Sequence, residues 1–83
     1  MSAFERVVEI LRDTLQLGDR ANSLTPSSQL LGGLPEFDSM AVVSVVTMLE
    51  DEFGISVDDD ELSSDVFATV GSLASFLEKK LAP

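Results

Sequence analysis

The spacing of apolar side chains is the feature that most restricts how this chain folds. Apolar residues recur every three or four positions, with polar ones between them, over about residues 2–16, 38–53 and 70–81. This pattern predicts three amphipathic helices, and a short helical turn is expected at 63–67. The stretch VVSVV favours a strand by composition, but no second stretch alternates as a partner strand would. We therefore expect an all-α fold.

Local signals place the ends of these helices. Gly18 is the expected stop of the first helix, and Gly54 is the expected stop of the second. Asp38 or Ser39 begins the second helix, and Thr69 is a candidate cap for the last one.

The connection between the first two helices, residues 18–38, is rich in Gly, Pro, Ser and Asn. Loops beyond about 12–15 residues are uncommon unless they pack or function. We expect apolar side chains to pin this one to the core: Leu24, Leu30, Leu31, Leu34 and Phe37. The predicted fold is a small four-helix bundle, three main helices plus one short helix, with a long first loop. Its 83 residues suffice for a single domain, 1–83.

Residue types that catalysis and metal binding commonly use are missing. The chain has no cysteine and no histidine, so a disulfide, a thiolate metal site and the usual general base are all excluded. An enzyme is therefore disfavoured, and no metal site is expected. The acidic run at 58–61 lacks the spacing of a calcium-binding EF-hand loop, so it indicates a solvated turn.

The charge is strongly negative and unevenly distributed. The chain has fifteen acidic and five basic residues, which give a formal charge of −10. Residues 21–78 contain eleven of the acids and no basic residue. Such a surface repels nucleic acid and anionic lipid and attracts basic partner surfaces, unless the acidity serves only solubility. The N-terminus does not resemble a signal peptide, and no apolar run approaches the ~20 residues of a membrane span. We expect a cytoplasmic monomer.

The second predicted helix carries more apolar surface than a small core requires. One row on its projection holds Val42, Val46, Leu49 and Phe53, with Val43 beside it. A second row holds Ala41, Val45 and Met48, and a polar strip holds Ser44, Thr47 and Asp51. Either neighbouring helices pack on both sides, or part of this surface meets a partner.

The sequence FDSM before this helix leaves two roles open for Ser39. Asp38 or Ser39 can accept a hydrogen bond from an early backbone N–H, and the Asp38 charge complements the helix dipole. A phosphate attached to Ser39 would also lie beside free N–H groups. No His, Lys or Arg stands near it in sequence to activate the hydroxyl, so a separate enzyme would have to modify it. Ser39 is either a plain cap or the attachment point of a carrier.

The stretch LLGGLPEFDSMAVVSVVTMLEDEFGISV, residues 30–57, resembles the centre of acyl and peptidyl carrier proteins. In that family an Asp-Ser-Leu type motif opens the second helix, which ends in acids followed by Phe. Asp38-Ser39-Met40 and the acids before Phe53 match this order. Further on, DVFATVGSLASFLEKKL resembles the family's short third helix, its Thr-Val-Gly junction and its last helix.

The resemblance implies that Ser39 carries 4′-phosphopantetheine, attached from coenzyme A by a phosphopantetheinyl transferase, with Asp38 and Met40 beside it. The arm's thiol would hold acyl or aminoacyl groups as thioesters for ligases or synthases of lipid, polyketide or peptide-type biosynthesis. The chain itself would be a non-catalytic carrier. The alternative is an acidic helical interaction module with no prosthetic group.

Three positions depart from the family pattern. Met40 follows the serine in place of the usual Leu, and its flexible side chain of similar size should still pack beside the arm. Ala41 and Ser44 stand where carriers of fatty-acid synthesis usually place exposed acids. This favours a more apolar docking surface, similar to that of carriers for peptide synthetases or for a dedicated AMP-forming ligase. The residues expected to contact partners are Val42, Ser44, Met48, Glu50 and Asp51.

Overall fold

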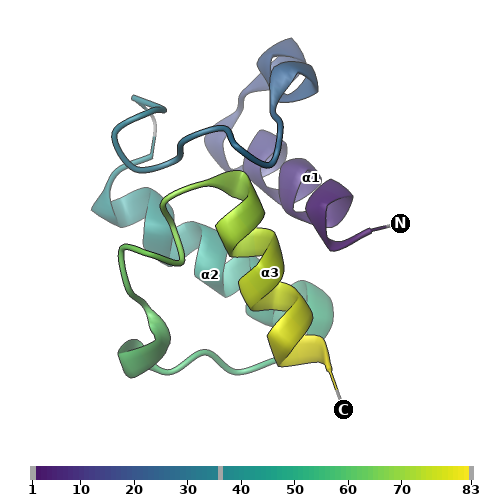
Figure 1. Cartoon of the computed structure of the whole chain (residues 1–83), viewed down its shortest axis with the longest axis vertical. Coiled ribbons are helices and arrows are strands. Elements are labelled where there is room, and N and C mark those ends of the chain that lie inside the picture. The colour runs from purple at the N-terminus through teal and green to yellow at the C-terminus, as the bar shows by residue number, and fades with distance from the viewer. Residues whose placement is uncertain (1, 36, 83) are drawn as a thin grey trace.

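The computed structural model describes residues 2–35 and 37–82, and helices dominate them (Figure 1). The α-helices are α1 (Ala3–Leu15), α2 (Ser39–Phe53) and α3 (Val70–Leu81). Two short 3₁₀ helices, η1 (Gly18–Ser23) and η2 (Asp59–Glu61), lie in the connections. The described residues contain one isolated β-bridge, between Gln29 and Thr69, and no strand. The all-α prediction is confirmed, including the helical assignment of VVSVV.

The short helix lies earlier than the sequence indicated. Residues 59–61 form η2, whereas 64–67 form a turn in which the Val66 N–H donates to the Ser63 carbonyl at 3.1 Å. A turn held by one such bond gives too little regular structure to continue as a helix.

The end of α1 also differs from expectation. Ser2 caps its start, because the Ser2 hydroxyl accepts from the Glu5 N–H at 3.2 Å. The helix ends when Gln16 adopts a left-handed conformation with φ 54°, and its N–H donates to the Arg12 carbonyl. Gly18 is therefore not the stop; it begins η1, which the sequence did not predict.

The other predicted ends are confirmed. Gly54 closes α2 with φ 63°, and its N–H donates to the Glu50 carbonyl. Thr69 caps α3, since its hydroxyl accepts from the Ser72 N–H at 3.0 Å and the Ser72 hydroxyl accepts from the Thr69 N–H at 3.0 Å.

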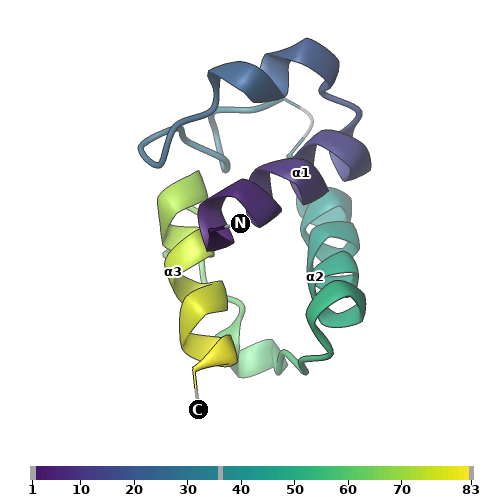
Figure 2. The same cartoon turned by 90° about the vertical axis from the view of Figure 1, so that its right-hand side faces the viewer.

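Helix α1 lies across the upper parts of α2 and α3 in Figure 2 and contacts both, and α2 and α3 run in the same general direction. A single apolar core fills the space between the three helices. Its fully enclosed side chains come from every helix and from the first connection: Val7, Leu11, Leu30, Val45, Leu49, Val70, Leu73 and Leu77. The chain must therefore return along α2 before α3 begins, which brings residues 62–67 back toward the start of α2.

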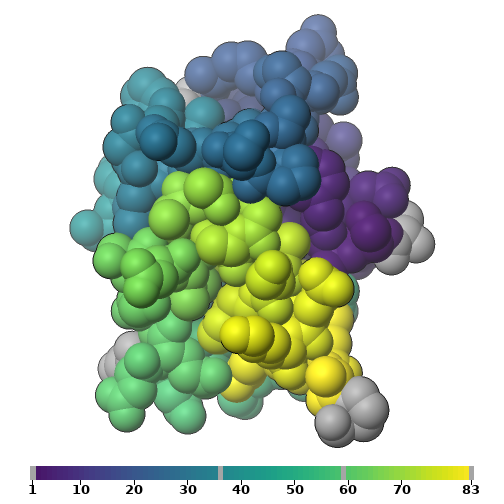
Figure 3. Space-filling view, viewed as in Figure 1, coloured from purple at the N-terminus to yellow at the C-terminus, as the bar shows by residue number. Residues whose placement is uncertain are grey.

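The first connection packs against the start of α3 (Figure 3). The Leu30 N–H donates to the Ala68 carbonyl at 2.9 Å, and the Val70 N–H donates to the Ser28 carbonyl at 2.9 Å. Leu30 and Phe37 are buried, and Leu24 and Leu34 are half-buried, as expected of anchors. Leu31 is the exception. It is 38% exposed, so it does not pin the loop to the core.

An ion pair links α1 to the C-terminal end of α2. The Arg6 guanidinium lies 2.9 Å from the Glu52 carboxylate and 5.4 Å from the centre of the Phe53 ring. Among the described residues, no helix has the length and apolar character that crossing a membrane requires.

Candidate functional site

The start of α2 distinguishes the roles of two adjacent residues. Asp38 is the cap: its Oδ1 accepts the Ala41 N–H at 2.9 Å. Ser39 is the first helical residue and is exposed, and no hydrogen bond from its hydroxyl forms within residues 2–35 and 37–82. The capping function therefore does not use Ser39, and its hydroxyl is available for chemistry.

Phe37 fixes the direction in which this helix starts. Its side chain is 4% exposed, and its ring centre lies 6.0 Å from that of Phe67, with the rings tilted by 40°. The Phe37 N–H also donates to the Leu34 carbonyl at 3.0 Å. Because Phe67 is buried on the segment that precedes α3, the tertiary fold holds the residues before Ser39 in place.

A groove of about 300 Å³ opens beside Ser39. Its wall combines the start of α2 with the returning segment: Leu31, Ser39, Val42, Leu62, Ser63, Ser64 and Phe67. Most of these side chains are apolar, so an apolar group attached near Ser39 could withdraw from water here.

The start of α2 fits a phosphodiester. Backbone N–H groups in a first helical turn have no intrahelical acceptor, and the helix dipole favours an anion there. Asp38 Oδ1 accepts the Ala41 N–H, and Ser39 and Met40 are the first two residues of the helix. Met40 is 76% exposed, so it lies at the surface beside Ser39 and outside the core.

The residues predicted to contact partners lie on different sides of α2. Ser44 and Asp51 are exposed, whereas Val42 and Met48 are half-buried. Val42 lines the groove beside Ser39, and Ser44 and Met48 line a different hollow next to α1. These side chains therefore do not form one continuous face.

Glu50, also predicted to contact partners, has a structural contact. Its Oε2 accepts the Val57 N–H at 2.9 Å, which holds the chain where it turns back after α2. Periodicity alone gives no signal for a bond that crosses a loop.

The pattern analysis left the side of one residue of α2 open and misplaced another. Val43, which lies beside the row of Val42 and Val46, is 61% exposed. Ala41 is only 8% exposed and belongs to the core, so it does not occupy the exposed face where fatty-acid carriers were expected to place an acid. Ser44 does lie on that face. The buried set Ala41, Val45 and Leu49 shows the spacing of four that could have separated the two sides.

The acidic turn after α2 is held by a basic side chain of α3. The pKa of Glu61 is lowered by a hydrogen bond from the Asp58 N–H and by the Lys80 ammonium, which lies 2.9 and 3.0 Å from its two carboxylate oxygens. In the part of the chain that the structure describes, no three acidic side chains are placed to hold a metal ion.

Known proteins are similar to this chain in sequence and in fold. Residues 5–77 match the family described as phosphopantetheine attachment site. The acyl carrier protein of Thermotoga maritima is 36% identical over 78 residues, which cover 94% of this chain and 90% of that protein. The solution structure of a holo acyl carrier protein from Nitrosomonas europaea matches with a TM-score of 0.90 and 58% identity, over 98% of each chain.

The fold is that of a helical carrier, and it places an exposed serine at the start of α2. The chain belongs to the acyl carrier protein family, whose cofactor is covalently attached 4′-phosphopantetheine. Members are non-catalytic carriers that interact with biosynthetic enzymes and with a phosphopantetheinyl transferase. Membership in this family favours the carrier function over the alternative of an interaction module that lacks a prosthetic group.

Proposed function

We propose that Ser39 is the attachment point and that the chain carries acyl intermediates as thioesters on its arm. The observation that carries this proposal is the division of roles at the helix start: Asp38 caps α2, and the adjacent Ser39 hydroxyl is exposed and unused. When bound, the arm supplies the thiol that the cysteine-free chain lacks.

The chain's own residues position the reacting oxygen and leave the proton transfer to the partner. Residues 21–78 contain no basic side chain, and the chain has no histidine, so the base that takes the Ser39 proton belongs to the transferase. Ser39 Oγ becomes the ester oxygen of the phosphodiester. The first-turn N–H groups and the helix dipole favour the attached anion, and Asp38 keeps α2 in register.

Acyl groups are the favoured cargo, because both relatives named above are acyl carrier proteins. Aminoacyl groups of peptide-type biosynthesis, and intermediates of lipid or polyketide biosynthesis, use the same thioester chemistry. Ser44 and Val43 are uncharged and exposed on α2, where carriers of fatty-acid synthesis usually present acids. This less charged surface supports a dedicated activating ligase as the enzyme that loads the carrier.

The proposal extends to where and how the carrier acts. Residues 1–83 form one carrier domain, which functions as a cytoplasmic monomer. The high negative charge favours the monomer, because like-charged copies repel one another.

Intact mass measurement tests the attachment. The apo protein, incubated with coenzyme A and a broad-specificity phosphopantetheinyl transferase, should gain one phosphopantetheinyl group, and Ser39→Ala should gain none. Ser75→Ala is the matched control, because it removes an exposed serine from α3 and should be modified like the wild type. Addition to Ser39→Ala, or none to the wild type, would contradict the proposal. Identifying the thioester-bound group on protein isolated from its host then names the cargo.

A further inference from the structure

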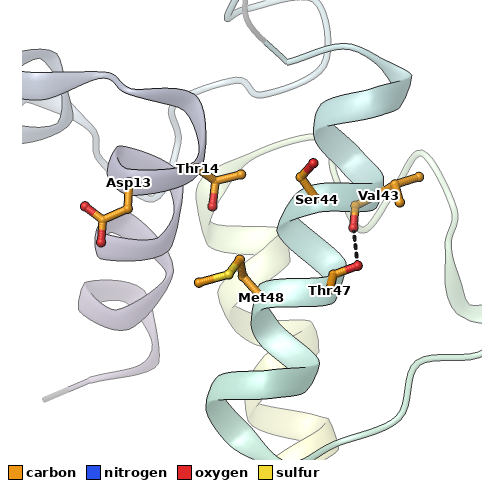
Figure 4. Close-up of a pocket in the computed structure, with 6 residues that line it drawn as sticks. All are labelled: Asp13, Thr14, Val43, Ser44, Thr47 and Met48. Atoms are coloured by element: carbon orange, nitrogen blue, oxygen red, sulfur yellow. Dashed lines mark hydrogen bonds between the residues drawn. The ribbon is translucent and has the colours of Figure 1, made fainter.

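Two hollows that border α2 differ in how their walls are built. The hollow between α1 and α2 is lined by residues of these two helices (Figure 4): Asp13, Thr14, Val43, Ser44, Thr47 and Met48. In the groove beside Ser39, by contrast, Leu62, Ser63 and Ser64 come from the connection between η2 and α3, which is not helical there. The shape of this groove therefore depends on what holds that connection in place.

Both ends of the connection are fixed by contacts with the helices. At one end, the Val57 N–H donates to Glu50 Oε2 on α2 at 2.9 Å. At the other, the Val66 carbonyl accepts the Ser72 hydroxyl of α3 at 2.8 Å, and the adjacent Phe67 is buried. Residues 58–65, which we call the strap, lie between these two fixed points and include the part of the groove wall that is not helical.

One side chain of α3 ties the strap to the rest of the fold. Lys80 Nζ lies 2.9 and 3.0 Å from the two carboxylate oxygens of Glu61. The other hydrogen bonds that the described atoms of the strap form join its own residues to one another or to Val66. The Glu61–Lys80 ion pair is therefore the polar attachment of the strap to another helix, within the part of the chain that the structure describes.

This ion pair lies where it can control the groove wall. Glu61 directly precedes Leu62, which lines the groove and is half-buried against the core. Lys80 is in the last turn of α3, a helix that the core holds through the fully enclosed Leu73 and Leu77. The side chains of Lys80 and Glu61 are only 24% and 31% exposed, so solvent screens the pair in part.

The groove fits an acyl chain carried on Ser39. Ser39 itself lines the hollow, and the apolar side chains of Leu31, Val42, Leu62 and Phe67 line it further. A long acyl chain that lies against them withdraws apolar surface from water. Enclosing the chain also shields the attached thioester from nucleophiles in solution, whereas a very short acyl group has too little apolar surface to gain from the groove.

We infer that the Glu61–Lys80 ion pair is a latch, which holds the strap against the groove and so determines how well a long acyl chain is protected. When the pair breaks, the strap moves away and the thioester becomes more accessible. Lys80 acts through Glu61 and Leu62, so it is a positioning residue. This inference rests on the proposed attachment at Ser39 and adds a control of the cargo that lies outside α2.

Cleavage of a loaded thioester by hydroxylamine tests the latch. A broad-specificity phosphopantetheinyl transferase with octanoyl-coenzyme A loads the octanoyl arm, and intact mass verifies loading and follows cleavage. The hydroxylamine nitrogen attacks the thioester carbonyl, the carbon–sulfur bond breaks, and octanoyl hydroxamate leaves the arm with a free thiol. Lys80→Met keeps the apolar stem and removes the charge. Its thioester should be cleaved about twofold to fivefold faster than that of the wild type, the range that loss of a partly exposed ion pair allows.

Three controls separate the latch from general loosening. Arg6→Met breaks the Arg6–Glu52 pair, which is also 2.9 Å long but involves no residue that lines the groove, and its octanoyl thioester should be cleaved at the wild-type rate. Lys80→Arg keeps the positive charge and should also be cleaved like the wild type. An acetyl thioester should be cleaved at the same rate in the wild type and in Lys80→Met.

Amide hydrogen exchange of the apo protein gives a readout that does not involve the arm. Lys80→Met should speed exchange about twofold to fivefold at Glu61 and Ser63, whose N–H groups donate within the strap, and leave Leu77 in α3 unchanged. Glu61→Gln keeps an oxygen for the Asp58 N–H and removes the charge, so it should match Lys80→Met in both measurements. It also serves as the test variant if Lys80→Met folds poorly.

Each contrary outcome can be told apart from the others. Equal octanoyl cleavage rates in the wild type, Lys80→Met and Glu61→Gln, with normal loading of Ser39, would overturn the latch and leave the attachment site intact. An equal increase in Arg6→Met would overturn it by showing general loosening of the fold. An equal increase for the acetyl thioester of Lys80→Met would overturn it by showing that the groove is not involved. Failure to load Ser39 in the wild type would overturn the attachment and the latch together.

Discussion

The Asp38 carboxylate accepts the Ala41 N–H at 2.9 Å, so the residue that caps α2 is the neighbour of Ser39. The negative side chain faces the free N–H groups of the helix, and Ser39 Oγ remains exposed. Asp38 thus stabilises the helix start, and the hydroxyl of the next residue stays exposed.

Substitution of these neighbours should affect stability to different extents. Asp38→Ala should lower the free energy of unfolding by about 1 kcal/mol, because the cap is lost. Ser39→Ala should change it by less than about 0.5 kcal/mol, because an exposed side chain without partners is removed. Urea unfolding followed by circular dichroism measures both. Equal losses for the two variants would show that Ser39 shares the capping function.

Glu50→Ala should destabilise the chain through the loop after α2. The Val57 N–H would lose its acceptor, at a cost of about 1–2 kcal/mol in the free energy of unfolding. Asp51→Ala, at the exposed neighbouring acid, is the control and should change stability little. Chemical denaturation under the same conditions measures the free energy of unfolding of both variants. A Glu50→Ala variant as stable as the wild type would contradict a structural role for Glu50.

Asp51→Lys should slow association with partner enzymes. It reverses an exposed charge on a helix that has no basic residue, so electrostatic steering toward a basic partner surface weakens. Stopped-flow association with the transferase should show a reduced on-rate at low salt and a smaller difference at high salt. Glu50→Lys is less informative, because it also breaks the bond to Val57. An on-rate unchanged at low salt would argue against steering.

Gly71→Ala should destabilise the contact between the first connection and α3. A Cβ on residue 71 would lie 2.6 Å from the Pro26 carbonyl oxygen, which also accepts the Gly71 N–H at 2.8 Å. Relieving this clash requires a backbone shift, with an expected loss of about 1–3 kcal/mol. Ser75→Ala, at an exposed position of the same helix, provides the comparison. Thermal unfolding that leaves Gly71→Ala at the wild-type Tm would refute the close approach.

The Glu61–Lys80 ion pair should make stability depend on pH in the acid range. The hydrogen bond from the Asp58 N–H and the Lys80 charge lower the folded-state pKa of Glu61, so its contribution is present above the unfolded-state pKa. That contribution is lost as the pH falls through the lower folded-state pKa. Glu61→Gln should therefore lose less stability than the wild type between about pH 5 and pH 3. Urea titrations at a series of pH values test this, and parallel profiles would exclude a role for the pair.

The sequence alone determined the helices and the attachment motif. Periodic apolar residues place α1, α2 and α3 within a residue or two, since helical spacing and caps such as Thr69 are local signals. The carrier-family motif at Asp38 and Ser39 is likewise contiguous.

Only the tertiary structure decided which apolar residues remain exposed and which acids are engaged. Val43 and Ala41 are both apolar residues of the same helix, yet tertiary packing leaves Val43 exposed and encloses Ala41 in the core. The Glu50 carboxylate accepts the Val57 N–H, and the Glu61 carboxylate accepts the Lys80 ammonium. The roles of these two acids therefore depend on residues 7 and 19 positions away in the sequence. Periodicity reports which side of a helix is apolar, and only the packing of its neighbours determines how much of that side they cover.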